Sequence, residues 1–188
     1  LMCLTTVSNE LNEDAFINMA DDVAGEIAYA LAKKEDECGF LGDGTSTYGG
    51  VVGLANAMGS AGVVSSDEMS ADTLAQAIAQ TDIEWMTGVM SKLPAYADTP
   101  NCKFYMHKTV YHQLIQHLAL GLGGTTQSMM LNEKVVPQIF GYPVEFVQVM
   151  PNLGTLTDSL HVAYFGDLSL ATSFGDRRQT EIQISDSA

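Results

Sequence analysis

The feature that most constrains the fold is an apolar stripe in the first forty residues. Hydrophobic side chains recur there at every fourth position, namely at Leu11, Ala15, Met19, Val23, Ile27 and Leu31. This spacing predicts one long amphipathic helix, which Ser8 or Asn9 can cap and Gly39 can end. About thirty residues at a rise of about 1.5 Å each make a rod of roughly 45 Å, far longer than the average globular helix.

The exposed face of this helix is acidic, with ten acidic and two basic residues from Asn9 to Asp43. An ordinary solvated face explains these charges. The length is less ordinary, because a long rod in a chain of 188 residues usually serves as a structural strut. A sharp break follows at residues 42–45, Gly-Asp-Gly-Thr. Its residue types favour a structural turn over a phosphate-binding loop, which would need a lysine after Gly44.

The rest of the chain predicts a mixed α+β fold with helices early and strands late. The pattern indicates a glycine-rich loop with short strands over residues 48–64, a helix over about 70–93 and a weaker helix over 109–120. Strands are expected at 104–106, 141–151, 162–165, 168–174 and 181–184, with a flexible segment at 121–127.

The charge balance argues against tight binding of duplex nucleic acid. The chain has 23 acidic and 8 basic residues, a formal net charge of −15. A duplex-binding surface needs clustered lysine and arginine to neutralise phosphates, and the basic pairs here are only Lys33-Lys34 and Arg177-Arg178. Sequence-specific nucleic acid binding is therefore not expected. Charged residues make up 16% of the chain, below the roughly 25% usual for soluble domains, which suggests that partners cover some of the surface.

No motif in the sequence indicates catalysis, a metal or another cofactor. The three cysteines form no disulfide framework, and neither they nor the four histidines match a metal-binding spacing. No serine lies in a nucleophile elbow, and no apolar run approaches the roughly 18 residues that span a membrane. A small hydrolase or transferase stays open as a rival, because a Cys–His pair, or Asp43 with Asp167, could meet in space. An adaptor with one apolar pocket is another rival.

Three charged residues are candidates for contacts between subunits. Arg177 and Arg178 lie between expected strands, where the plain interpretation is a turn with a surface ion pair of little energetic weight. The sharper interpretation is that one arginine reaches a carboxylate on a neighbouring subunit, since bases are scarce and acids abundant. We take Asp43, Arg177 and Arg178 as candidate assembly contacts.

Five short segments, in order over nearly the whole chain, carry a family resemblance. They are VSNEL at 7–11, KEDE leading into FLGDGT at 34–45, FGYPV with MP at 140–151, FGDL at 165–168 and GDRR at 175–178. Each segment alone is weak, but the ordered set resembles the major capsid family of tailed bacteriophages, which has the Hong Kong 97-type fold.

The resemblance implies an α+β layout of two lobes. Residues 1–41 would be the spine helix of the peripheral lobe, residues 42–164 the axial lobe, and residues 165–188 strands that return to the peripheral lobe. It also implies a structural protein that is not an enzyme and has no cofactor. Copies would form pentamers and hexamers of an icosahedral head around double-stranded DNA, in a tailed phage or prophage.

The same resemblance implies partners and a location. Scaffold, portal and protease would act with the subunit during assembly in the bacterial host cytoplasm, and the product would be the virion capsid. The family's N-terminal arm and extended loop are absent before Leu1, and further sequence is absent after Ala188, so we expect a truncated core that assembles poorly alone. Some relatives cross-link Lys to Asn between subunits, but no residue here is assigned to that role. The nearest alternative is an encapsulin-like nanocompartment shell, which neighbouring genes would distinguish.

Overall fold

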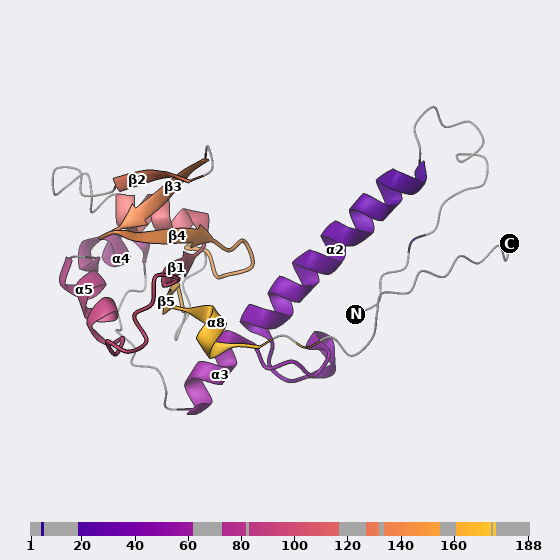
Figure 1. Ribbon diagram of the computed structural model, residues 1–188, viewed down its shortest axis with the longest axis horizontal. Coiled ribbons are helices and arrows are strands. Elements are labelled where there is room, and N and C mark those ends of the chain that lie inside the picture. The colour runs from indigo at the N-terminus through magenta and orange to yellow at the C-terminus, as the bar shows by residue number, and fades with distance from the viewer. Residues whose placement is uncertain are drawn as a thin grey trace, which may run out of the picture.

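The computed structural model describes residue 5 and residues 19–61, 73–81, 83–116, 127–131, 134–154, 161–173 and 175. They form a compact body of sheet and helices from which one long helix projects (Figure 1). The expected α+β class is confirmed by this mixture of helices and a sheet.

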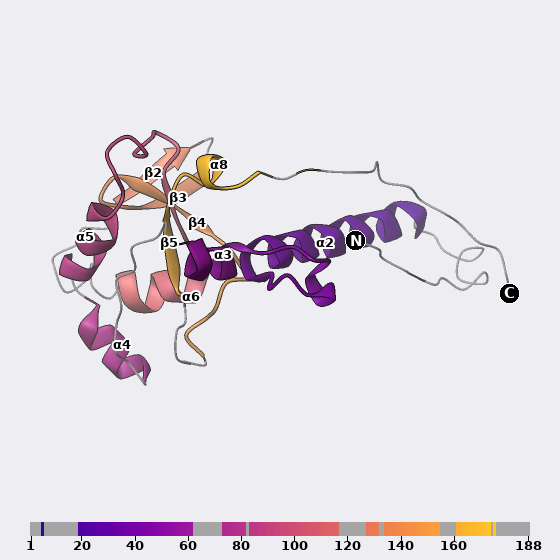
Figure 2. The ribbon, with the colours of Figure 1, turned by 90° about the horizontal axis from the view of Figure 1, so that it is seen from below.

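The long helix is α2, Met19–Leu41, with 23 residues. At about 1.5 Å per residue it is roughly 35 Å long. It stands out from the body as a rod in two perpendicular views (Figures 1 and 2). The predicted helix is confirmed over these residues, whereas its expected start at residues 8–18 lies outside the described part. The expected stop at Gly39 is wrong, because the helix continues to Leu41 and Gly42 ends it.

The segment after α2 is more helical than its glycine content predicts. A short 3-10 helix, η1, spans Ser46–Tyr48, and α3 spans Leu54–Ala61. The expectation of short strands at 48–64 is wrong for the described residues of this segment. An isolated β-bridge between Asp43 and Val52 takes their place. The reason is local, since Leu-Ala-Asn-Ala-Met at the start of α3 is rich in helix-forming residues.

The body contains a five-stranded mixed sheet in the order β2-β3-β4-β1-β5. Its central pair, β1 and β4, runs parallel, and the other neighbours run antiparallel. The bounds are β1 Lys103–Met106, β2 Gln127–Leu131, β3 Lys134–Ile139, β4 Tyr142–Phe146 and β5 Ala163–Gly166. The strands expected at 104–106, 141–151 and 162–165 are confirmed as β1, a shorter β4 and β5. The β2–β3 hairpin was not foreseen.

Helices pack on one face of this sheet and enclose the core. They are α4 Leu74–Gln80, α5 Ile83–Ser91, α6 Lys108–Val110 and a five-residue π-helix, η2, at Tyr111–Ile115. The least exposed large side chains are Phe104, Met86, Met106, Leu114 and Val110. Each such side chain contributes about 1.5–3 kcal/mol by leaving water. The core therefore joins the middle of the sheet to α5, α6 and η2.

Two expectations about single elements are wrong. The helix expected over 70–93 is broken into α4 and α5, because Thr81 takes an extended backbone and its hydroxyl donates to the carbonyl of Ala77 at 2.7 Å. The strand expected over 168–174 begins instead as a short helix, α8, at Leu168–Ala171. Asp167 caps α8 by accepting from the backbone N–H of Ser169 at 2.9 Å. No described helix is long and apolar enough to cross a membrane.

Candidate assembly site at the base of helix α2

The base of α2 is built on a close approach of two backbone segments. We call residues 42–53 the junction loop. A Cβ atom on Gly53 would lie 2.4 Å from the amide nitrogen of Gly42 and 2.8 Å from the carbonyl oxygen of Cys38. A Cβ atom on Gly42 would lie 2.4 Å from the carbonyl oxygen of Val51. Both positions therefore require glycine, since the obstructing atoms are backbone.

Hydrogen bonds close the junction loop and cap α2. The N–H of Gly53 donates to the carbonyl of Gly42 at 2.8 Å, and the N–H of Gly44 donates to the carbonyl of Val51 at 3.0 Å. The side-chain amide of Asn56, on α3, donates to the carbonyls of Leu41 at 3.3 Å and Gly42 at 2.8 Å. These bonds satisfy carbonyls that the end of a helix leaves without partners, and they fix the direction in which α2 leaves the body.

The candidate contact Asp43 lies in this loop and is exposed. Its Oδ1 accepts from the backbone N–H of Thr45 at 2.9 Å, which is the local turn bond expected of Asp in such a sequence. Hydrogen bonds from the side chain and then the backbone of Thr45 lower the pKa of Asp43 below its ordinary value. Asp43 therefore keeps its negative charge over the physiological pH range. The other two candidates, Arg177 and Arg178, lie outside the described residues.

Lys34, on α2, holds its charge within the subunit. The Lys34 ammonium lies 3.0 Å from a carboxylate oxygen of Glu37 and 5.0 Å from the centre of the Tyr48 ring, in η1. The hydrogen bond to Glu37 raises the pKa of Lys34, against the opposing effect of burial. A half-exposed pair of this kind contributes little stability, but it turns Lys34 towards the junction loop.

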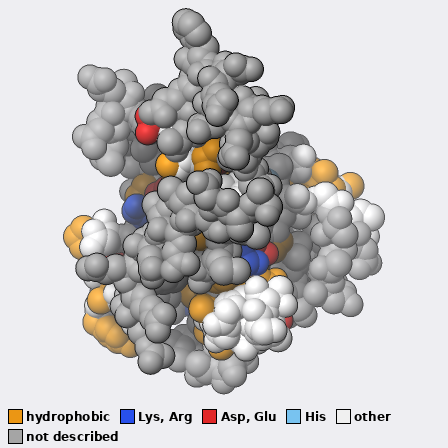
Figure 3. All heavy atoms as spheres, turned by 90° about the vertical axis from the view of Figure 1, so that its right-hand side faces the viewer, with side chains coloured by type: hydrophobic (Ala, Val, Ile, Leu, Met, Phe, Trp, Pro, Cys, Tyr) orange, Lys and Arg blue, Asp and Glu red, His pale blue; other side chains and the backbone are white. Residues whose placement is uncertain are grey.

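The site also exposes apolar side chains. Val52 is 58% exposed and forms the bridge to Asp43, and the adjacent Val51 is 38% exposed. Tyr29 on α2 is 70% exposed, and no residue from Asp21 to Glu37 is buried. Figure 3, which views the molecule from the side towards which α2 projects, shows hydrophobic side chains among the described residues with isolated charges between them. The arrangement suits a contact surface better than a reaction.

The described residues do not assemble a catalytic constellation. No group of three or more His, Cys, Asp or Glu that could hold a metal is present among them. Asp167 is occupied by capping α8 and accepts a hydrogen bond from Thr99 at 2.5 Å. His107 caps α6 by accepting from the N–H of Thr109 at 3.2 Å. Each of these titratable groups has a structural role nearby.

A hollow of about 530 Å³ lies between α4, η2 and the segment after β4. Neutral residues line it, namely Thr73, Leu74, Thr109, Gln113, Asn152, Leu153 and Gly154. None of these side chains titrates in the physiological range, so the hollow holds no general acid or base. It gives no support to the hydrolase or transferase interpretation.

The comparison with protein families favours a structural role over an enzyme. The model of the Phage capsid family matches residues 1–188. The chain belongs to the phage capsid family. This is a structural family, not a family of enzymes, whose members build the virion shell from many copies of one subunit. No curated protein and no solved structure matches the chain.

This family assignment confirms the resemblance carried by the five sequence segments. The structure adds two residues of the junction that sequence reasoning missed, Gly53 and Asn56. The glycine spacing around residues 49–53 was a signal of close backbone contact, but it indicated a loop without indicating its partner. Asn56 gave no signal, because its partners lie 14 and 15 residues away.

Proposed function

We propose that this chain is a major capsid subunit with the Hong Kong 97-type fold, which self-assembles into the icosahedral head of a tailed phage or prophage around double-stranded DNA. The observation that carries the proposal is the family match over all 188 residues. Identical subunits suit a closed shell, because symmetry repeats each modest contact many times.

The lobes of the proposed subunit follow the break at the end of α2. Residues 1–41 are the spine helix of a peripheral lobe, residues 42–164 an axial lobe, and residues 165–188 the return to the peripheral lobe. The projecting α2 and the compact sheet body support a boundary at Gly42, where the helix ends. The proposed return begins at the end of β5 and continues with the short helix α8.

We expect the junction loop to contact a neighbouring subunit through opposite charges. Asp43 carries an exposed negative charge, and Arg177 and Arg178 are the adjacent basic pair late in the chain. Two neighbouring arginines are well suited to a carboxylate on another copy. The acidic subunit, with a net charge of −15, would leave packaged DNA mobile inside the shell. Scaffold, portal and protease are the proposed assembly partners in the host cytoplasm.

The proposal is tested by expressing the complete gene product and measuring its sedimentation and its nuclease-protected DNA. Large uniform particles that protect DNA in the presence of the other head proteins support it. Particles filled with a cargo enzyme indicate the nanocompartment alternative, and a protein that stays a small oligomer under all conditions contradicts both.

A variant pair separates charge from turn geometry at Asp43. Asp43→Asn keeps an oxygen that accepts from Thr45 and removes the charge, whereas Asp43→Lys reverses it. If an arginine pairs with Asp43, both variants weaken assembly, and combining Asp43→Lys with Arg177→Glu and Arg178→Glu restores part of it. Normal assembly of Asp43→Lys would show that this charge makes no contact.

A further inference from the structure

The turn between β3 and β4 holds an aromatic residue in a backbone conformation that suits it poorly. Ile139 pairs with Tyr142 across the two strands, so Phe140 and Gly141 form a two-residue turn. Their φ angles are 49° and 91°. Two positive φ angles are typical of the turn that fits the twist of a hairpin, and Asn-Gly or Asp-Gly normally fills it.

Phe140 is the one described non-glycine residue with a positive φ. A bulky side chain in this region crowds its own backbone, whereas asparagine adopts the same conformation with much less strain. Such strain persists only where the surrounding structure enforces it, and it is found most often at functional positions. The β3–β4 register enforces the turn here, so the choice of phenylalanine needs a separate reason.

Packing within the subunit supplies only part of that reason. The Phe140 side chain is 43% exposed and is not part of the core cluster. The aromatic core begins beside it without including it, since the Tyr142 ring lies 5.0 Å from that of Phe165 and 6.4 Å from that of Phe104. Among the described residues, Phe140 stacks on no other ring.

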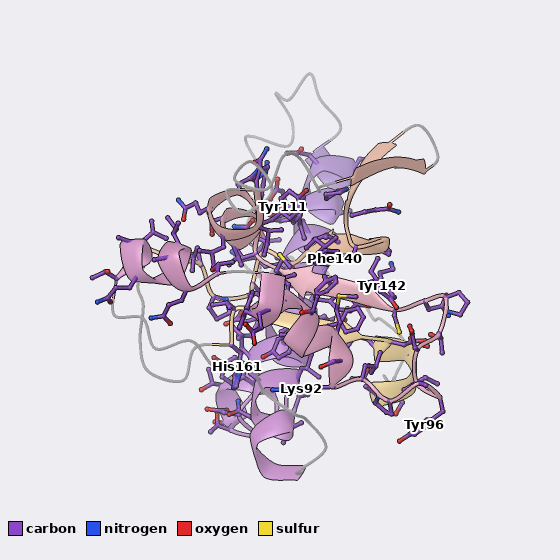
Figure 4. The ribbon with its side chains drawn as sticks, turned by 90° about the vertical axis from the view of Figure 1, so that its left-hand side faces the viewer. Lys92, Tyr96, Tyr111, Phe140, Tyr142 and His161 are labelled. Atoms are coloured by element: carbon purple, nitrogen blue, oxygen red, sulfur yellow. The ribbon has the colours of Figure 1, made fainter. Side chains whose placement is uncertain are left out.

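The turn nevertheless presents this ring on a rigid support. Ile139 is 4% exposed, and the hydroxyl of Tyr142 donates to the carboxylate of Asp98 at 2.9 and 3.1 Å. Figure 4 shows Phe140 and Tyr142 on the side of the body opposite the projecting α2. An aromatic side chain held in place before binding loses little entropy when a partner covers it. Aromatic residues are also enriched among the side chains that dominate protein interfaces.

We infer that Phe140 is an interface residue that packs against a second copy of this chain in the assembled shell. The inference rests on the proposed function and deepens it by locating a contact. The second copy is the favoured occupant because the family builds its shells from identical subunits. Charge supports this choice, since two subunits that each carry −15 repel, and an uncharged aromatic contact avoids adding to that repulsion.

The test compares Phe140→Asn with Phe140→Tyr in the complete gene product. Asparagine removes the ring and relieves the turn, whereas tyrosine keeps both the ring and the strain, so it is the matched control. The melting temperature of each protein is measured at a concentration too low for particles to form. The lowest protein concentration at which particles form, called the threshold, is then measured by sedimentation. We expect Phe140→Asn to raise the melting temperature by about 2–4 °C and to raise the threshold at least about tenfold. Phe140→Tyr should match the wild type in both measurements.

The opposite results separate this inference from the proposed function. If the wild type forms particles and Phe140→Asn forms them at the same threshold, Phe140 makes no contact between copies and only this inference fails. If Phe140→Asn melts below the wild type, the ring stabilises its own subunit and the argument from strain is wrong. If the wild type forms no particles under any condition, the proposed function fails, and this contact fails with it.

Discussion

Replacing Gly53 with alanine should loosen the joint between α2 and the body. The added Cβ would lie 2.4 Å from the amide nitrogen of Gly42, 2.8 Å from the carbonyl oxygen of Cys38 and 2.8 Å from the carbonyl carbon of Phe40. All three obstacles are backbone atoms, so no side chain can rotate away to make room. The backbone of the junction loop must move instead, and the 2.8 Å hydrogen bond from Gly53 to Gly42 is lost or lengthened.

The expected loss of stability follows from this geometry. Overpacking at a closely packed position costs about 1–3 kcal/mol. For a protein of this size, that loss lowers the urea midpoint by roughly 1 M. Equilibrium urea unfolding of the unassembled subunit, followed by circular dichroism, measures the change. Hydrogen exchange should also quicken at the last turn of α2, where the joint holds the helix end.

Two glycines of α2 provide matched controls. A Cβ atom on Gly25 or Gly39 would meet nothing within 4 Å. Alanine is the better helix former by about 0.5–1 kcal/mol, so Gly25→Ala and Gly39→Ala should leave the urea midpoint unchanged or raise it. Unfolding of Gly53→Ala at the wild-type midpoint would contradict a close backbone contact at Gly53, as would an equal loss of stability in the two controls.

Three further changes have defined outcomes. Asn56→Ala removes both side-chain bonds to the end of α2 and should cost about 1–2 kcal/mol in urea unfolding; an unchanged midpoint would count against the cap. Hydrogen bonds from Ser169 and then Thr99 lower the pKa of Asp167 below its ordinary value of 3.8. The ionised carboxylate therefore stabilises the folded protein at any pH above 3.8, and this stabilisation is lost as the pH falls through the lower pKa of the folded state. Thermal unfolding in acid should therefore show a weaker pH dependence for Asp167→Asn, and parallel curves would contradict this. Phe104→Ala, at a residue 1% exposed, should cost about 3–5 kcal/mol, and a loss below about 1 kcal/mol would contradict its core position.

Elements with a strong local pattern were predictable from the sequence. The stripe through Val23, Ile27 and Leu31 predicted α2, because apolar residues spaced four apart fall on one face of a helix and fit few other secondary structures. The alternating residues around Val144 gave β4 in the same way. The break between α4 and α5 was not predictable, since the backbone turns extended at Thr81, within a segment whose apolar spacing favours one helix.

Features that depend on tertiary contact were missed because the local sequence does not show which distant segment a residue meets. The β3–β4 hairpin turn is Phe140-Gly141, which lacks the Asn-Gly or Asp-Gly signal of its turn type. In the junction loop, the turn role of Asp43 followed from its neighbours, because its partner Thr45 is two residues away. The glycine contact at Gly53 joins segments eleven residues apart in the chain, and sequence spacing does not show which backbone a glycine meets.

Cryo-electron microscopy of the complete gene product shows whether identical copies close into a shell. We predict closed particles of icosahedral symmetry whose repeating unit contains the five-stranded body and α2 as a straight rod with its exposed side chains covered by neighbouring density. A protein that remains monomeric or forms open, irregular aggregates across a wide range of salt and concentration would contradict its role as a shell subunit.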